Sequence, residues 1–398
     1  MVKKKLFPVP VALLVLVMLA VAACNSGKPS AKKAEEKWSV RMANTVMAQA
    51  DSLTKYVAGP PKWAYDVAFL GMAIDRLGDI DPKYSGYMEN WIDYFVQPDG
   101  SVINYRLDEY NLDRIYPGRN ILTIYKRKPE ERYKIAMDNL IEQLKTHPKT
   151  NSGGYWHKKI YPWQMWLDGI YMASTYMVQY AKEFNAPGWY DVAANQAKMV
   201  YGKTLDPSSG LLMHAWDESR EQRWCNPETG QSQYPWSRAM GWYAMALTDI
   251  LDYLPPDHSD RDTLINILQN VSKALLEVRD PESGIWYQVL NQGGREGNYL
   301  EGSGSAMYIY VFAKAARLGY LDQKYRDIAS DALDDFIREL VTVDEKGMVT
   351  IRNICGGCGL GGNPYRDGSY EYYINEKRFE NDTKGVAPFI LAAIELDR

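Results

Sequence analysis

The stretch Asp206-Pro-Ser-Ser-Gly210-Leu-Leu212 decides the fold, because its pattern recurs along the chain. An acidic residue opens a polar turn that ends at glycine, and apolar residues follow directly. The pattern returns at Asp280-Pro-Glu-Ser-Gly284-Ile-Trp286 and Asp344-Glu-Lys-Gly347-Met-Val349, and in related forms at Gly100 and Gly154. A turn that recurs in this way indicates a chain built from repeated structural units.

Helical periodicity of apolar residues fills the intervals between the turns, and each interval can hold two helices and a hairpin. With an N-terminal pair, the turns predict about six helical hairpins. The clearest strand-like stretches, Trp286–Leu290 and Met348–Ile351, are short, and no stretch alternates helix with a buried strand as in a doubly wound fold. The periodicity predicts helices at about 38–57, 65–78, 84–97, 118–127, 130–146, 165–184, 189–203, 237–253, 259–278, 303–318, 322–340 and 383–396.

Small residues open the helix that follows each turn, as in Leu167-Asp-Gly169, Ser237-Arg-Ala-Met-Gly241 and Gly302-Ser-Gly-Ser305. If the hairpins close into a ring, these helix starts meet at one end of it. The positive ends of the helix dipoles would make that end attractive to an anion. No linker interrupts residues 38–398, so we predict that they form a single catalytic domain.

The first residues have the features of a bacterial lipoprotein signal. Three lysines precede the apolar run Leu6–Val21, and Val21-Ala-Ala-Cys24 is a small-residue cleavage site that ends in cysteine. The run is short for a spanning helix, which favours cleavage of residues 1–23 over an uncleaved anchor. Cys24 would then carry the lipid, and residues 24–37 would form a flexible tether. We therefore expect a lipid-anchored protein of the bacterial cell envelope.

The composition narrows the possible partners. The net charge of −4 and the lack of a basic cluster after the signal give no electrostatic case for nucleic acid. The 30 tyrosines and 12 tryptophans point weakly to carbohydrate. Apart from Cys24, the cysteines are Cys225, Cys355 and Cys358, an odd number that cannot all pair. The Cys355–Cys358 pair has no second pair to complete a zinc site, and no HExxH motif occurs, so we expect no metal.

Asp168 is the candidate catalytic acid. It is the one acid in Tyr161-Pro-Trp-Gln-Met-Trp-Leu-Asp-Gly-Ile-Tyr171, a run that is otherwise mostly aromatic and aliphatic. Burial among rings favours the protonated form of a carboxyl group, which suits it to donate a proton. Rings such as Trp166 beside a single acid are also a common way to hold a sugar. The alternative is that Asp168 only caps the helix.

Asp113 and two histidines are further candidates. Asp113 comes just before the helix start of its repeat, and Asp168 lies at the helix start of the next repeat. Because these places are equivalent, the two acids could face one pocket. Its alternative role is in a turn or a helix cap. His157 lies in the connection that leads to Asp168, and His214 lies in the segment after the turn at Gly210. For each histidine the alternative is a purely structural hydrogen bond.

Arg238 is the candidate anion binder. It stands at a predicted helix start, and its guanidinium offers a planar fork for a carboxylate. Trp242 lies four residues later, on the same face of the helix. The alternative for Arg238 is a salt bridge to a neighbouring acid. The polar loop 219–235 is long enough to line a cleft beside these residues.

These motifs together resemble glycoside hydrolase family 105, the unsaturated rhamnogalacturonyl hydrolases, which are related to the unsaturated glucuronyl hydrolases of family 88. The resemblance runs from about Trp63 to the C-terminus. The sequence departs from the family pattern at Ser237, where glycine is expected, and at Cys358. The motifs that carry it are Gln164-Met-Trp-Leu-Asp-Gly169, His214-Ala-Trp-Asp-Glu218, Arg238-Ala-Met-Gly-Trp-Tyr-Ala-Met-Ala246, Gly359-Leu-Gly-Gly362 and Arg366-Asp-Gly-Ser-Tyr-Glu-Tyr-Tyr373.

The resemblance implies an all-α (α/α)6 toroid with short β-hairpin connections, in agreement with the repeat. It also implies hydrolysis of a terminal 4,5-unsaturated uronic acid of galacturonyl type from oligosaccharides left by a polysaccharide lyase, such as unsaturated rhamnogalacturonan disaccharides. Asp168 would protonate C4 of the vinyl ether, and water would add at C5. The hemiketal would then rearrange and release the next sugar. No metal or organic cofactor is implied.

The same resemblance implies roles for the other candidates. Asp113 would assist in positioning, and His157 would line the pocket beside Trp166. The residues implied to contact the unsaturated sugar are His214, Arg238 and Trp242.

Other functions stay open at this point. The enzyme could be an unsaturated glucuronyl hydrolase that acts on fragments of ulvan or glycosaminoglycan. It could also be an ordinary inverting glycosidase that uses Asp113 and Asp168 as an acid–base pair on saturated chains. A third possibility is a surface lipoprotein that binds glycan without turnover, against which the intact Asp168 argues.

The lipoprotein prediction can be tested through Cys24. The Cys24→Ala variant should not be acylated, because the thiol that carries the lipid is missing. We expect the variant to leave the detergent phase in a partition experiment in which the wild type stays there. A variant that partitions like the wild type would show that the anchor is not a lipid on Cys24.

Overall fold

The computed structural model describes residues 1–2 and 36–398, and Lys37–Arg398 form one compact unit. Nearly all of the predicted signal peptide and of the tether, including Cys24, lies outside the described residues, so these stay predictions. Within the described part, no helix is long and apolar enough to cross a membrane.

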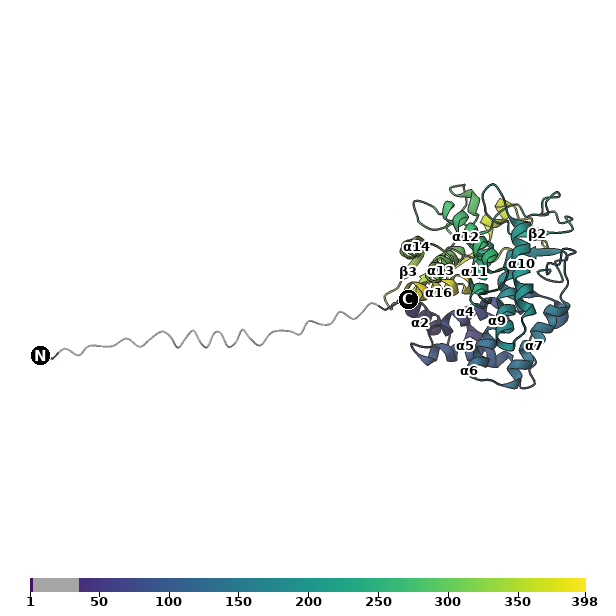
Figure 1. Ribbon diagram of the computed structural model, residues 1–398. Helices are drawn as coiled ribbons and strands as arrows, with labels where there is room; N and C mark the ends of the chain where they lie inside the picture. The colour runs from purple at the N-terminus through teal and green to yellow at the C-terminus, as the bar shows by residue number, and fades with distance from the viewer. Residues whose placement is uncertain (3–35) are drawn as a thin grey trace. The chain divides into compact units, whose positions relative to one another are not determined.

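The fold is an (α/α)6 toroid, as the repeat and the family resemblance predicted. Successive inner helices pack against one another, and α16 closes the ring by packing against both α13 and α4. Figure 1 shows α16, near the C-terminus, beside α4 from the N-terminal part. The inner helices are α4 (Tyr65–Asp75), α6 (Gly118–Arg127), α8 (Leu167–Gly169) continued by α9 (Thr175–Phe184), α11 (Ser237–Leu251), α13 (Gly302–Arg317) and α16 (Thr383–Leu396).

The outer helices cover this ring and differ from it in composition. Every residue of α11 is buried, as expected for a helix that has protein on all sides. By contrast, α14 buries residues such as Tyr325, Ala329, Ala332 and Phe336, which form one stripe at helical spacing. The outer helices are α2 (Trp38–Gln49), α5 (Pro82–Phe95), α7 (Glu131–Thr146), α10 (Gly188–Thr204), α12 (Arg261–Glu277) and α14 (Lys324–Leu340).

Two helix predictions need correction. The predicted helix 38–57 is two helices, because α2 ends at Gln49 and α3 (Leu53–Tyr56) restarts from Ser52. Ala50 after α2 is extended, and the Ser52 side chain accepts a hydrogen bond from the Thr54 amide, which caps the start of α3. The predicted helix 165–184 begins instead as a strand. The sequence analysis also did not foresee α15 (Tyr370–Asn375).

The strands are short antiparallel pairs in the connections. The prediction at Met348–Ile351 is confirmed by β4 (Val349–Ile351), which pairs with β3 (Val341–Val343). The prediction at Trp286–Leu290 is wrong, because only isolated bridges form there, at Tyr287 and Val289. A strand of only two or three residues shows too little alternation of apolar and polar side chains to be recognised in a sequence. The pairs missed in this way are β1 (Gln164–Trp166) with β2 (Ala215–Asp217), and β5 (Ile354–Cys355) with β6 (Arg378–Phe379).

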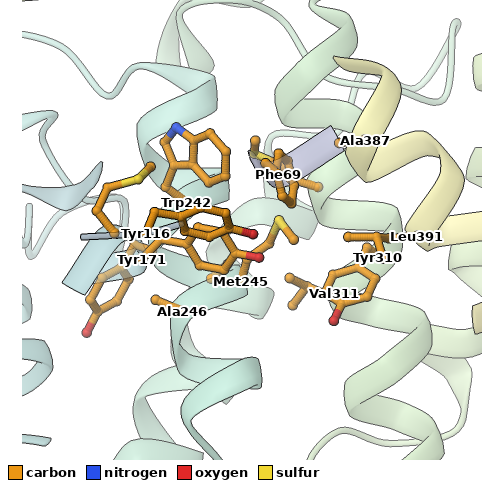
Figure 2. Packing of buried hydrophobic residues seen from close by; sticks show 14 of the residues in the cluster. Phe69, Tyr116, Tyr171, Trp242, Met245, Ala246, Tyr310, Val311, Ala387 and Leu391 are labelled. Atoms are coloured by element: carbon orange, nitrogen blue, oxygen red, sulfur yellow. The ribbon is translucent and has the colours of Figure 1, made fainter. Parts of the chain in front are cut away.

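Aromatic rings fill the centre of the toroid (Figure 2). Trp242 of α11 stacks on Tyr171 with 5.0 Å between ring centroids, and Tyr171 stacks on Tyr116 at 5.4 Å. Phe69 of α4 meets the edge of Trp242 at 5.0 Å. Offset stacks and edge contacts of this kind stabilise beyond the area they bury. The inner helices are thereby joined across the ring by one rigid cluster.

Asp249, near the end of α11, is the polar counterpart of this cluster. Its carboxylate accepts hydrogen bonds from Arg119 at 2.9 Å, Lys314 at 2.8 Å, Tyr171 at 3.2 Å and Tyr310 at 2.8 Å. Burial alone would raise the pKa of Asp249, but the charges of Lys314 and Arg119 hold that pKa well below its ordinary value. One charged carboxylate therefore ties together residues from α6, α11, α13 and the turn before α9.

We predict that Asp249→Asn strongly destabilises the fold. The substitution leaves the Arg119 and Lys314 cations buried without their common counter-ion, which typically costs about 3–5 kcal/mol. The free energy of unfolding from chemical denaturation measures the loss. Asp252→Asn is the matched control, because Asp252 is 27% exposed and bonds to Lys314 alone within the described residues. Equal losses in the two variants would contradict a central role for Asp249.

Candidate active site

The pairing of β1 with β2 positions the predicted acid. Trp166, the last residue of β1, pairs with Ala215, the first residue of β2, and the Leu167 amide donates to the His214 carbonyl at 3.2 Å. Asp168 therefore comes just after the end of β1, and His214 comes just before the start of β2. The pairing of the two strands brings these residues together. Their side chains face each other, with 3.6 Å between His214 Nε2 and Asp168 Oδ2. The sequence analysis named both residues but not the strand pair that joins them.

Asp168 is not the N-cap of its helix. The cap position of α8 belongs to Trp166, and no side-chain capping bond is made there. The Asp168 side chain is 14% exposed, so part of it is open to a ligand, while Oδ2 is buried without a hydrogen-bond partner. A π-helical turn, Ile170–Ser174, follows directly. Such turns are frequent at functional sites.

Asp113 lies in the short 3-10 helix Leu112–Arg114, beside the connection that carries His157. Lys158 Nζ is 2.6 Å from its carboxylate, and His157 Nε2 is 3.5 Å away. Burial alone would raise the pKa of Asp113, but the Lys158 ammonium, with help from His157 and Arg114, holds that pKa below its ordinary value. Asp113 is therefore ionised near pH 7, and its side chain is 16% exposed.

His157 is fixed by the backbone on both sides. Its carbonyl accepts from the Leu112 amide at 3.1 Å, and its amide donates to the Gln164 carbonyl at 2.8 Å. Burial lowers the pKa of His157 to about 4, more than the negative charges of Asp113 and Asp168 raise it. The ring is therefore neutral near pH 7. A neutral buried imidazole can give or accept a hydrogen bond without adding charge.

Three parallel rings form a wall beside the two acids. Trp166 stacks on both neighbours, with centroid distances of 4.6 Å to His157 and 4.9 Å to Tyr161 and interplanar angles of 13° and 14°. The edge of the same indole meets His214 at 5.4 Å. Trp166 thus contacts both histidines that the sequence analysis selected. The stack fixes their positions relative to each other.

Arg238 is the second residue of α11 and is 1% exposed. Its Nη1 donates to the Ser303 hydroxyl at 3.3 Å and to the Cys355 carbonyl, and its guanidinium lies 4.7 Å from the Trp236 ring centroid. Burial would lower the pKa of Arg238, but nearby Cys355 and other negative groups raise it above its ordinary value. Among residues 36–398 the structure gives this cation no salt bridge. The structure therefore does not support the alternative that Arg238 forms a salt bridge to a neighbouring acid.

Five of the seven candidate site residues share one further property: each has a buried polar atom without a hydrogen-bond partner. Thirteen buried side-chain atoms in the described residues lack a partner, and five belong to the predicted set. Such atoms are rare in folded proteins, and each calls for an explanation. A bound polar ligand is one. The five are His157 Nδ1, Asp168 Oδ2, His214 Nε2, Arg238 Nε and Trp242 Nε1.

The sequence analysis missed Tyr65, the first residue of α4. Its ring meets the edge of Trp242 at 6.0 Å. Burial, and then the nearby charges of Asp113 and Asp168, raise the pKa of Tyr65 well above its ordinary value, and the positive charge of Arg238 acts against them. A neutral hydroxyl therefore lies among three predicted residues. Its position at a helix start, equivalent to that of Arg238, was the signal that could have revealed it.

Tyr373 and Lys158 were also missed. The Tyr373 hydroxyl bonds to His214 Nδ1 at 2.9 Å, which orients the imidazole. Lys158 forms the ion pair with Asp113. Among residues 36–398 no group of three or more His, Cys, Asp or Glu side chains is arranged to hold a metal ion.

Comparison with known proteins agrees with this geometry. The family model for Glycosyl Hydrolase Family 88 matches residues 38–398. A solved glycoside hydrolase from family 105 of C. acetobutylicum ATCC 824 has 40% sequence identity and a TM-score of 0.88, over 91% of this chain and 99% of that chain. The solved unsaturated glucuronyl hydrolase of Bacillus sp. GL1 shares the fold, at 14% identity and a TM-score of 0.59, over 90% of this chain and 95% of that one.

Curated relatives point the same way. Protein Atu3128 of Agrobacterium fabrum is 36% identical over 233 residues, which are 56% of this chain and 97% of the relative. Unsaturated rhamnogalacturonyl hydrolase YesR of Bacillus subtilis is 24% identical over 283 residues, which are 70% of this chain and 76% of the relative. The chain is thus a glycoside hydrolase, and it belongs to Glycosyl Hydrolase Family 88 as that model describes it and to the related family 105.

Proposed function

We propose that this glycoside hydrolase removes a terminal 4,5-unsaturated uronic acid from oligosaccharides produced by a polysaccharide lyase. The observation that carries the proposal is the set of five buried, unpartnered polar atoms on candidate site residues, Asp168 among them. A uronic acid brings a carboxylate and several hydroxyl groups, which could pair with these donors and acceptors. Trp166 supplies flat apolar surface beside them, and Trp242 belongs to the aromatic cluster in the centre of the ring.

The reaction needs a group that gives a proton to C4 and then takes one from water. Asp168 has the required position, because it is partly exposed and faces His214. When the Tyr373 hydroxyl donates to Nδ1 of His214, the proton of that imidazole lies on Nε2 and points to Asp168. The protonated double bond develops positive charge at C5, which attracts water. The resulting hemiketal opens and releases the next sugar, while Asp168 recovers its proton from the water.

Asp113 supports this step as a fixed negative charge. Its ion pair with Lys158 keeps it ionised, so in this proposal it orients the sugar and does not donate the proton. This division of labour separates the proposal from an ordinary inverting glycosidase, in which the two acids would act as acid and base on a saturated chain. The two reactions differ in whether the vinyl-ether absorbance disappears.

Arg238 is the proposed binder of the uronate carboxylate. A guanidinium that is buried, charged and without a salt bridge within the described chain can accept an external carboxylate at little further cost in desolvation. Its place at the start of α11 adds the favourable end of the helix dipole. Trp242, one turn deeper, would lie against the ring of the same sugar.

For the substrate we propose a galacturonyl-type sugar linked to rhamnose, as in unsaturated rhamnogalacturonan fragments of pectin. YesR supports this class by its name, at 24% identity. An unsaturated 3S-rhamnoglycuronyl hydrolase of Formosa agariphila, 23% identical over 290 residues, has a name that does not specify a galacturonyl sugar, so the glucuronyl alternative stays open. A panel of lyase-digested pectin, ulvan and glycosaminoglycan would rank these substrates. We further propose, from Val21-Ala-Ala-Cys24 alone, that the enzyme is lipid-anchored in a bacterial cell envelope.

We predict that Asp168→Asn keeps the fold and substrate binding but loses turnover. The amide is nearly isosteric, while a missing general acid alone typically costs about 10²–10⁴-fold in rate. Turnover is followed as loss of the ultraviolet absorbance of the unsaturated sugar. Asp113→Asn is the comparison, and its loss should be smaller. In heavy water the wild type should place deuterium at C4 of the product, and deuterium elsewhere would exclude the proposed protonation step.

We predict that Arg238→Ala selectively impairs the charged substrate. Loss of a desolvated charge pair should cost roughly 2–5 kcal/mol in kcat/KM for an unsaturated uronate. The control is the uncharged methyl ester of the same disaccharide, on which the substitution should have little effect. An equal loss on ester and acid would assign Arg238 a structural role. Unchanged kinetics on the acid would remove it from the site.

A further inference from the structure

Two cysteines that the proposed reaction does not use lie against Arg238. Cys355 ends β5, and Cys358 follows after two glycines. Their sulfur atoms are 3.5 Å apart, and both thiols are free and buried. A disulfide holds its sulfurs at about 2.05 Å, so closing this pair needs a contraction of roughly 1.5 Å. The pair is therefore close to, but not at, the geometry of a disulfide.

The surroundings favour a reactive sulfur at Cys355. A hydrogen bond from Cys358, and then the charge of Arg238, lower the pKa of the Cys355 thiol, while burial raises the pKa of Cys358 well above its ordinary value. Gln288 Nε2 donates to Cys355 Sγ at 3.2 Å, which also stabilises a thiolate. One cysteine can thus act as the nucleophile while its neighbour keeps its proton, a combination typical of Cys-X-X-Cys pairs.

Hydrogen bonds connect Cys355 to two residues of the candidate site, Arg238 directly and His214 through Gln288 and Tyr373. The Cys355 carbonyl accepts a hydrogen bond from Arg238 Nη1, so the backbone of the pair helps to set the guanidinium. Gln288 also donates to the Tyr373 carbonyl at 3.1 Å, and the Tyr373 hydroxyl bonds to His214. A shift of the two sulfurs would therefore act directly on Arg238 and, through Gln288 and Tyr373, on His214.

We propose that Cys355 and Cys358 form an oxidation site, and that a hydroperoxide closes them into a disulfide that weakens carboxylate binding by Arg238. The inference rests on the proposed function for the identity of the carboxylate ligand. The reduced dithiol is the active form. Contraction of the sulfurs pulls on the Cys355 carbonyl, which changes the position of the guanidinium it holds.

The chemistry balances with hydrogen peroxide as the oxidant. The Cys355 thiolate attacks one peroxide oxygen, the O–O bond breaks, and hydroxide leaves and is protonated, which gives a sulfenic acid and water. The Cys358 sulfur then attacks the Cys355 sulfur, the S–O bond breaks, and hydroxide leaves with the Cys358 proton as a second water. Two thiols are oxidised to one disulfide, and one peroxide is reduced to two waters.

The sulfur pair lies close to the protein surface at Gly357. Gly357, between the cysteines, is exposed, and neither it nor Gly356 has a side chain that covers the pair. Cys358 itself is 5% exposed, whereas Cys355 is fully buried. The site is therefore suited to hydrogen peroxide and closed to bulky disulfides.

The test uses the full-length enzyme, treated with hydrogen peroxide and then freed of it. Mass spectrometry of the peptide that spans both cysteines should show a loss of two hydrogens. KM for the unsaturated uronate should rise about tenfold, a usual size for coupling between sites, with a much smaller change in kcat. Dithiothreitol should restore both the mass and KM. Cys225→Ser is the matched control and should respond like the wild type, because Cys225 is buried elsewhere in the chain.

The Cys355→Ser/Cys358→Ser double variant should keep an unchanged KM after peroxide. If it fails to fold, Cys358→Ala serves, since it retains Cys355 and its contact with Arg238 but cannot form the disulfide. Binding of galacturonic acid, measured by calorimetry, gives a readout without turnover and should weaken on oxidation. Absence of the disulfide, or a disulfide that leaves both KM and binding unchanged, would overturn the proposal. If the untreated wild-type enzyme has no activity on any unsaturated substrate, the proposed function itself is wrong.

Discussion

The carboxylate of Asp249 is the interaction on which the arrangement of the inner helices depends. It lies deep in the ring, where a lone charge would be very costly, and it is accepted there because two cations and two tyrosines surround it. The partners come from different repeats. Non-directional packing would allow those repeats to slide, whereas hydrogen bonds to one carboxylate fix their register. Tyr171 also stacks on Trp242, so the same network fixes the position of this candidate site residue.

On this frame, the candidate site residues lie near the starts of the inner helices and in the connections that precede them. Tyr65, Asp168 and Arg238 are each within the first two residues of a helix. The β1–β2 pair then brings Asp168 to His214, which is distant in sequence. Rigid elements hold groups more precisely than free loops do. A toroid that gathers many helix starts at one end is therefore a suitable carrier for a sugar site.

The sequence predicted the fold well, because the recurring turns and the helical period are both local signals. It failed where a structure depends on residues far apart. The pairing of Trp166 with Ala215 spans a whole repeat, and three residues of strand leave no periodic signal. Tyr65 was missed for a related reason: its place at a helix start is a weak signal for one tyrosine among 30, and its importance comes from Asp113 and Arg238, which are near it only in space. The acids, histidines and arginine were found because such residues are rare in apolar runs and matched a family pattern.

A comparison of two acids separates structure from function in this molecule. Asp249 and Asp168 both lie among aromatic rings and helix backbones, and both are more than four-fifths buried. Asp249 is saturated with donors from the protein, so nothing external can bind to it. Asp168 instead keeps a buried oxygen without a partner, next to a histidine nitrogen in the same state. Leaving buried polar atoms unpaired costs stability. The aromatic cluster and the ion pairs of Asp249 stabilise the fold and can offset that cost. In the proposed function, the unpaired atoms are one half of contacts whose other half is the substrate.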